Sequence, residues 1–193
     1  MNKKENLSKY LVNSCDVISQ IDEQLDKINQ IADLIKKTKK NRKKILICGN
    51  GGSYSEAEHL ATELVCTYDK KNRKPIPAYL LGSNAGSLTA WSNDFEYESY
   101  LCREIEAIGS KNDILIIFTT SGGNENKKQS KNLLNIAKLS KKKGLKVISI
   151  TGKKGGDIIK YSSLFIHIKN EKTSHIQEAH LVILHLICEI LEK

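Results

Sequence analysis

The stretch Lys44 to Glu63, KILICGNGGSYSEAEHLATE, decides the fold. Ile45 to Cys48 is a short, uncharged, apolar run that stops at glycine, which predicts a buried strand. The glycines of GNGGS allow a tight turn, and Ser53 is a suitable N-cap for a helix over Ser53 to Thr67. Backbone N–H groups at a helix start favour an anion. Because the glycine spacing matches neither GxGxxG nor GxxxxGK[ST], a phosphate group is the expected ligand of this turn.

His59 and Glu63 lie four residues apart on that predicted helix. Both side chains therefore project from one face, about 6 Å apart along the axis. This spacing suits either a surface ion pair or two ligands of one metal ion. The phosphate-type turn one to three helical turns away adds weight to the metal interpretation.

Length and composition indicate one soluble domain with at most a short appendage. The net charge of +9 comes almost wholly from lysine, which fits either attraction of an anionic ligand or a lysine-biased surface. Aromatic content of 6% and the lack of a recognisable motif count against specific nucleic-acid binding. The five cysteines are scattered and lack C-x-x-C spacing, so we expect reduced core residues. Without an apolar signal core or a long apolar run, the sequence predicts a cytoplasmic protein with no membrane partner.

Residues 6–37 contain neither proline nor glycine and predict one long helix. Its apolar residues recur at alternating steps of four and three, which is a heptad pattern. Two interpretations follow: the helix packs against another subunit, or it lies across its own domain. We assign residues 1–40 to an oligomerisation segment and residues 41–193 to the ligand-binding domain. The seam consists of Leu7, Leu11, Ser14, Ile18, Ile21, Leu25, Ile28, Ala32 and Ile35.

Strand and helix signals alternate after residue 44, as in βαβ units. The pattern predicts an α/β fold: a three-layer, doubly wound, mostly parallel five-stranded sheet with helices on both faces. Ligands of such sheets bind beyond the carboxyl ends of the strands. The expected strands are 45–48, 78–81, 114–119, 147–151 and 164–168, and the expected helices are 53–67, 83–91, 96–107, 125–143, 157–161 and 174–191.

The third expected strand runs into Thr119, Thr120, Ser121, two glycines and Asn124. Three consecutive hydroxyl groups exceed what one N-cap needs, so this loop is a second candidate phosphate site. The glycines after Thr151 follow the next strand and indicate a turn.

Five motifs in order resemble the sugar isomerase (SIS) domain family, and within it the phosphoheptose isomerases. They are GNGGS at 49–53, AEHLATEL at 57–64, SND at 92–94, TTSGGN at 119–124 and IQEAHLVILH at 176–185. The resemblance implies conversion of sedoheptulose 7-phosphate to D-glycero-D-manno-heptose 7-phosphate, for the synthesis of lipopolysaccharide core or capsule. It also implies a homotetramer with active sites between subunits, which would give the first helix its partner.

The resemblance further implies a metal ion, usually zinc (Zn2+), held by His59, Glu63, Gln177 and His185. Substrate would lie near Asn50, Gly51, Gly52 and Ser53, near Asn93 and Asp94, and along Thr119, Thr120, Ser121 and Asn124, with Gln177 also beside it. Spacing alone makes His180 the easier partner of Gln177, because Gln177 and His185 are about 12 Å apart along a helix.

Interconversion of a ketose and an aldose moves a proton between adjacent carbons, and a carboxylate suits that task. We assign the base to Glu63 and the movement of oxygen-bound protons to His185, although the division of roles between them stays open. Departures from the family pattern at Tyr54, Asn124, Ser174 and His175 concern the identity of the sugar. The alternatives are a non-catalytic SIS protein that binds the replication initiator and a SIS isomerase of another sugar phosphate.

Overall fold

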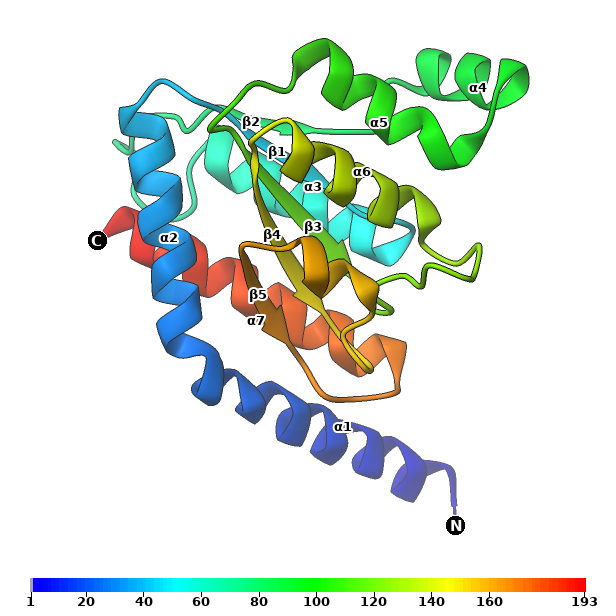
Figure 1. The fold of residues 1–193 in the computed structure, drawn as a ribbon. Coiled ribbons are helices and arrows are strands. Elements are labelled where there is room, and N and C mark those ends of the chain that lie inside the picture. The colour runs from blue at the N-terminus through cyan, green and yellow to red at the C-terminus, as the bar shows by residue number, and fades with distance from the viewer. Residues whose placement is uncertain (1) are drawn as a thin grey trace.

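The computed structural model describes residues 2–193 and contains one five-stranded sheet, in which every neighbouring pair is parallel. The strand order is β2-β1-β3-β4-β5 (Figure 1). All residues of β1 and β3 are buried, because helices cover both faces of the sheet. The predicted parallel α/β sheet is confirmed. The strands are β1 (Ile45–Cys48), β2 (Ala78–Leu80), β3 (Ile114–Thr119), β4 (Lys146–Thr151) and β5 (Leu164–His167).

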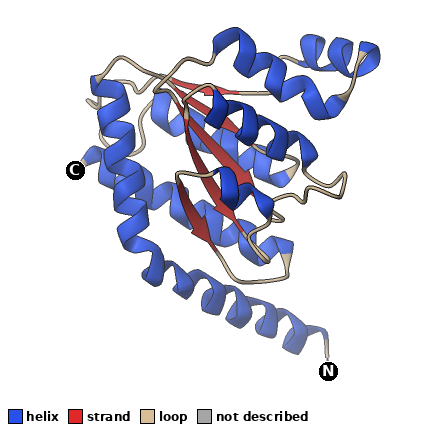
Figure 2. Cartoon of the chain, in the orientation of Figure 1, coloured by secondary structure: helices blue, strands red, loops and turns tan. Residues whose placement is uncertain are grey.

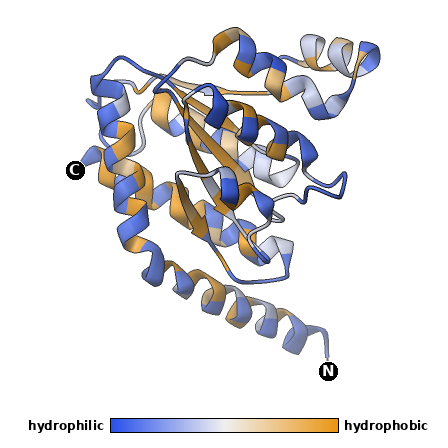
Figure 3. Cartoon of the chain, viewed as in Figure 1, coloured by the Kyte–Doolittle hydropathy of each residue, from blue (hydrophilic) through white to orange (hydrophobic). Residues whose placement is uncertain are grey.

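Two helical layers enclose the sheet (Figure 2). Alternate strand residues face opposite layers: Ile45 and Ile47 pack in one core, whereas Leu46 and Cys48 pack in the other. The first core joins the sheet to α2 (Leu25–Lys40), α3 (Gly52–Val65) and α7 (Thr173–Glu192). The second joins it to α5 (Tyr97–Ile108), α6 (Lys131–Lys142) and the 3-10 helix η2 (Asp157–Tyr161). The hydrophobic colouring of Figure 3 accordingly concentrates on the strands and the inner faces of the helices.

The amino-terminal helix is not continuous as predicted. α1 (Lys3–Ser19) and α2 are separated by a 3-10 turn, η1 (Gln20–Gln24), where the chain changes direction (Figure 1). The break lets α2 follow the sheet while the hydroxyl groups of Tyr10 and Ser14 on α1 donate to Glu178 on α7.

Part of the heptad seam packs on the chain's own domain, and part of it is exposed and free to contact another subunit. Ile28, Ala32 and Ile35 are fully buried in the chain's own core, as expected for a helix across its own domain. Leu7 and Leu11 on α1 are 61% and 65% exposed. Leu7 and Leu11, at the start of the seam, therefore stay exposed within one chain, whereas Ser14 and Ile21 further along are buried.

Three further local predictions need correction. The helix expected from Glu125 begins at Lys131, because Asn124 accepts a hydrogen bond from the Asn126 N–H and holds the preceding segment in a turn. The segment Asp157–Tyr161 is a 3-10 helix. Of the five unpaired cysteines, Cys15 and Cys66 are exposed and are not core residues.

Within residues 2–193, no helix has both the length and the apolar character needed to cross a membrane.

Candidate active site between two parallel helices

Helices α3 and α7 lie side by side and run in the same direction, with contacts at three successive levels. Gln177 contacts Gly52 at the first level, and His180 Nδ1 lies 3.3 Å from Glu56 Oε2 at the second. At the third level the rings of His59 and His185 are 5.1 Å apart between centroids. Two motifs separated by more than a hundred residues of sequence are thus brought together.

His59, Glu63 and His185 form a partly exposed cluster at the third level. His59 Nε2 is 3.3 Å from Glu63 Oε1, and the two imidazole rings meet edge to face at 76°. Burial lowers the pKa of His185, the nearby His59 lowers it further, and Glu63 opposes the shift. His185 therefore favours the neutral imidazole, which can accept a proton or ligate a metal.

Gln177 lies apart from these three side chains. Its amide fills the space beside Gly52, and within residues 2–193 it forms no hydrogen bond to the cluster. Among the described residues, no three His, Cys, Asp or Glu side chains already have the arrangement of a metal site. The donor chemistry of His59, Glu63 and His185 nevertheless suits zinc, which accepts imidazole nitrogen and carboxylate oxygen.

His180 does not join the cluster. It is fully buried, and its ring lies 6.0 Å from that of Phe118 on β3. Its buried partner is Glu56, one level before the His59–His185 contact, and its pairing there leaves it outside the cluster. The closer sequence spacing of His180 to Gln177 does not bring it to the cluster.

The GNGGS turn differs from the prediction at its N-cap. α3 begins at Gly52 and its N-cap is Gly51, whose φ of 56° favours glycine, while Ser53 lies inside the helix and is buried. The Ser53 N–H donates to Asn50 O at 3.0 Å, and the Tyr54 N–H donates to Gly51 O at 2.9 Å. The turn itself therefore uses two of the N–H groups expected to face an anion.

Asn50 is fixed by two residues that the sequence analysis missed. Its Nδ2 donates to Asn132 Oδ1 at 2.9 Å, and Asn132 Nδ2 donates in return to Asn50 Oδ1 at 2.8 Å. The Tyr97 hydroxyl also donates to Asn50 Oδ1, at 3.0 Å. Asn132 could have been found from its position, because it is a polar residue in the first turn of a helix that follows a ligand-type loop.

Two hydroxyl groups of the hydroxyl-rich loop, those of Thr119 and Ser121, already form hydrogen bonds within the protein. Thr119 Oγ1 accepts from the Gly122 N–H at 3.1 Å, and the hydroxyls of Ser121 and Ser130 are 3.0 Å apart. A Cβ on Gly122 would lie 1.9 Å from Gly155 O, so the turn after β4 supports this loop. Thr120 and Ser121 are only partly buried, and Asn124 is exposed.

The structure leaves Asn93 and Asp94 away from the cluster. They are exposed near the end of α4 (Ala85–Asp94), and Asn93 Nδ2 donates to Asp94 Oδ1 at 2.9 Å. No residue of α4 is buried, and the helix projects beside α5 at one end of the molecule (Figure 1).

Comparison with known proteins places this arrangement in a family. Residues 9–152 match the family model described as the SIS domain. The chain belongs to the SIS domain family. A phosphoheptose isomerase of Helicobacter pylori (strain HPAG1) is 41% identical over 81% of this chain and 78% of its own. One from Aliarcobacter butzleri (strain RM4018) is 38% identical over 91% and 88%. The solved structure of a phosphoheptose isomerase from Francisella tularensis superimposes over 100% of both chains with a TM-score of 0.91 at 27% identity.

Two of the departures from the expected family pattern, His175 and Tyr54, have defined contacts in the structure. His175 is buried against α1, with its Nδ1 3.1 Å from Glu178 Oε2 and its ring 4.4 Å from that of Tyr10. This SIS domain therefore uses His175 to attach its amino-terminal helix. Tyr54 lies on α3 with its ring against Gly82.

Proposed function

We propose that this SIS protein is a phosphoheptose isomerase that converts sedoheptulose 7-phosphate to D-glycero-D-manno-heptose 7-phosphate. The relatives and the matched structure named above support the reaction class. The observation that carries the proposal is the meeting of His59, Glu63 and His185 between α3 and α7. A carboxylate beside a neutral imidazole can supply the carbon-bound and oxygen-bound proton transfers of an aldose-ketose isomerisation.

The proton movements are assigned as follows. The Glu63 carboxylate removes a proton from C1 of the ketose, which gives an enediol, and returns a proton to C2. The neutral His185 imidazole accepts the hydroxyl proton from O1 and donates a proton to O2. The net change is a ketose converted to an aldose of the same composition. The lowered pKa of His185 keeps its ring available to accept a proton near neutral pH.

A zinc ion held by His59, Glu63 and His185, with Gln177 as the fourth ligand that the resemblance implies, would polarise the substrate carbonyl when bound. Gln177 would have to turn away from Gly52 to join it. Glu63 would then have two tasks, because the same carboxylate would ligate the metal and accept the substrate proton. Its carboxylate lies 3.3 Å from His59 Nε2, and its charge opposes the lowering of the His185 pKa.

The remaining assignments follow the resemblance. Thr119, Thr120, Ser121 and Asn124 would anchor the phosphate, with Asn50 and Gly51–Ser53 beside it. Asn93 and Asp94 would read sugar hydroxyls. We assign the product to surface heptose synthesis, in lipopolysaccharide core or capsule, and the enzyme to the cytoplasm. The exposed leucines of α1 support a homo-oligomer, proposed to be a tetramer.

The test incubates the purified, zinc-replete protein with sedoheptulose 7-phosphate and follows aldoheptose phosphate, with a chelated sample alongside. Glu63→Gln should lower turnover at least about 100-fold, the scale of a lost general base. Glu58→Gln is the matched control, since Glu58 is exposed on the same helix and lies outside the cluster.

The outcomes separate the competing functions. Zinc-dependent product that Glu63→Gln removes supports the proposal. No product with zinc bound would indicate another sugar phosphate as substrate. No product and no bound metal would favour the non-catalytic SIS function.

A further inference from the structure

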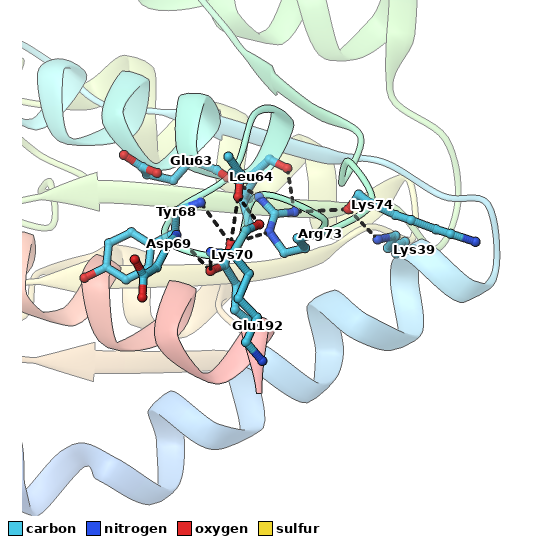
Figure 4. Close-up of polar contacts among 10 residues, drawn as sticks. Lys39, Glu63, Leu64, Tyr68, Asp69, Lys70, Arg73, Lys74 and Glu192 are labelled. Atoms are coloured by element: carbon cyan, nitrogen blue, oxygen red, sulfur yellow. Dashed lines mark hydrogen bonds and ion pairs between the residues drawn. The ribbon is translucent and has the colours of Figure 1, made fainter.

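Glu192, near the end of α7, holds the loop that follows α3 (Figure 4). Its carboxylate accepts hydrogen bonds from the backbone N–H groups of Tyr68, Asp69 and Lys70, at 2.9, 2.8 and 2.6 Å. Arg73 Nε donates to the same carboxylate at 2.9 Å. Both charged side chains are buried, with 8% of Arg73 and 4% of Glu192 exposed. We call this pair and its backbone contacts the Arg73–Glu192 clasp.

Arg73 also reaches the last turn of α3. One terminal nitrogen of its guanidinium donates to Leu64 O at 3.1 Å, and the other donates to Glu63 O. The final carbonyls of a helix lack partners within the helix, and a cation stabilises that end. The clasp therefore fixes the turn of α3 on which Glu63 lies.

The same clasp fixes Tyr68 beside His185. The Tyr68 N–H is bonded to Glu192, and the Tyr68 ring lies 5.7 Å from the His185 ring, tilted by 31°. Glu192 and His185 lie seven residues apart, so both project from similar sides of α7. One carboxylate thus connects the helix of His185 with the loop beside its ring.

Glu192 remains charged over the pH range in which the protein would work. Burial by itself raises the pKa of Glu192, but the N–H groups of Lys70, Tyr68 and Asp69 and the Arg73 side chain hold it at about 2. A permanently charged, buried pair with directed hydrogen bonds fits a fixed geometric role.

We propose that Arg73 and Glu192 are positioning residues for the isomerase site, which set the backbone of Glu63 and the ring of Tyr68 relative to His185. The inference rests on the proposed function and extends it to residues that touch no substrate. Tyr68, held by the clasp, forms one side of the site next to His185.

The test compares Glu192→Gln, Arg73→Gln and Tyr68→Ala with the wild type, at a temperature where all are folded. Each should lower kcat about 10–100-fold, because small misplacements of reacting groups have effects of that size. In Glu192→Gln and Arg73→Gln, KM and the affinity of the metal-free protein for sedoheptulose 7-phosphate should change less than about twofold, because the clasp touches no substrate. Arg73→Lys should recover part of the loss.

Two controls separate positioning from folding. The Arg73→Gln/Glu192→Gln double variant should be no slower than the worse single variant, since both act through one unit. Arg103→Gln removes an exposed arginine, whose ion pair with Glu106 lies at 3.3 Å, and should keep wild-type kcat. Hydrogen exchange should accelerate at the Tyr68, Asp69 and Lys70 amides in Glu192→Gln, whether or not metal is bound.

The outcomes distinguish this inference from the proposed function. If the wild type is active and the folded Glu192→Gln and Tyr68→Ala variants have the wild-type kcat, the positioning role is overturned and the proposed function stands. An inactive wild type would overturn the proposed function and the inference with it. Tyr68→Ala keeps the inference testable if the clasp variants do not fold, because Tyr68 is 36% exposed.

Discussion

Replacement of Gly52 by alanine should impair the site without unfolding the protein. Gly52 has a helical backbone, so the main chain accepts alanine. The added Cβ would lie 2.1 Å from Gln177 Nε2, 2.9 Å from its Cδ and 3.1 Å from its Oε1. Since the obstacle is the end of a flexible side chain, the Gln177 amide must move and the rest of the fold need not.

Two opposing terms set the effect on stability. Alanine is favoured over glycine in a helix by up to about 1 kcal/mol. Moving Gln177 to a poorer rotamer costs about 0.5–1.5 kcal/mol. The terms nearly cancel, so Tm should change by no more than about 4 °C. Displacing a ligand or its support lowers metal affinity or activity about 10–100-fold, and we expect a loss of that size in kcat/KM.

The assay measures kcat/KM with sedoheptulose 7-phosphate, zinc affinity by chelator competition, and thermal unfolding. Gly86→Ala is the matched control, because a Cβ there meets only Asn84 Oδ1, at 3.4 Å. Gln177→Ala should lose as much activity as Gly52→Ala, and the double variant should lose no more than either. Full activity of Gly52→Ala beside an impaired Gln177→Ala would refute the reasoning, because Gln177 would then act from another position.

Three other predictions concern stability and assembly. Glu56→Ala should lower the free energy of unfolding, measured in urea, by about 1–3 kcal/mol, because it leaves buried His180 unpaired. Thr62 is exposed on the same helix, and Thr62→Ala should change that free energy by no more than about 0.5 kcal/mol. Equal free energies for the two variants would contradict this prediction. The folded-state pKa of Glu192 is depressed to about 2 from 4.5, so its stabilisation is present above pH 4.5 and is lost as pH falls toward 2. The difference in free energy of unfolding between the wild type and Glu192→Gln should therefore become smaller as pH falls over that interval. A difference that stays constant with pH would argue against the stabilising role of the Glu192 charge. Finally, Leu7→Ser/Leu11→Ser should weaken the oligomer in sedimentation; an unchanged assembly would remove α1 from the interface.

The sheet was predictable because its central strands are buried on both faces. Ile45–Cys48 and Ile114–Thr119 are continuous apolar runs with a polar or glycine stop, and both strands have the predicted bounds. The break at Gln20–Gln24 was not predictable in this way. That segment contains neither glycine nor proline, and no local signal marks the point where the chain turns so that α1 and α2 can both pack against α7 while α2 also contacts β5.

Only part of the candidate site could be predicted from the sequence. His59 and Glu63 share a helix face by spacing, whereas their approach to His185 depends on how α3 and α7 pack. The link between Arg73 and Glu192 joins residues 119 positions apart and has no local pattern. Long-range polar contacts of this kind follow from the assembled fold and leave no periodic signal in the chain.

The most direct test of the central claim is isomerisation in D2O. Proton transfer by Glu63 through an enediol predicts deuterium at C2 of the aldoheptose phosphate and at C1 of recovered sedoheptulose 7-phosphate, both readable by NMR. Glu63→Gln should form neither labelled species. Product free of deuterium, together with near-normal turnover by Glu63→Gln, would contradict the account, because the hydrogen would then pass between the carbons without the carboxylate.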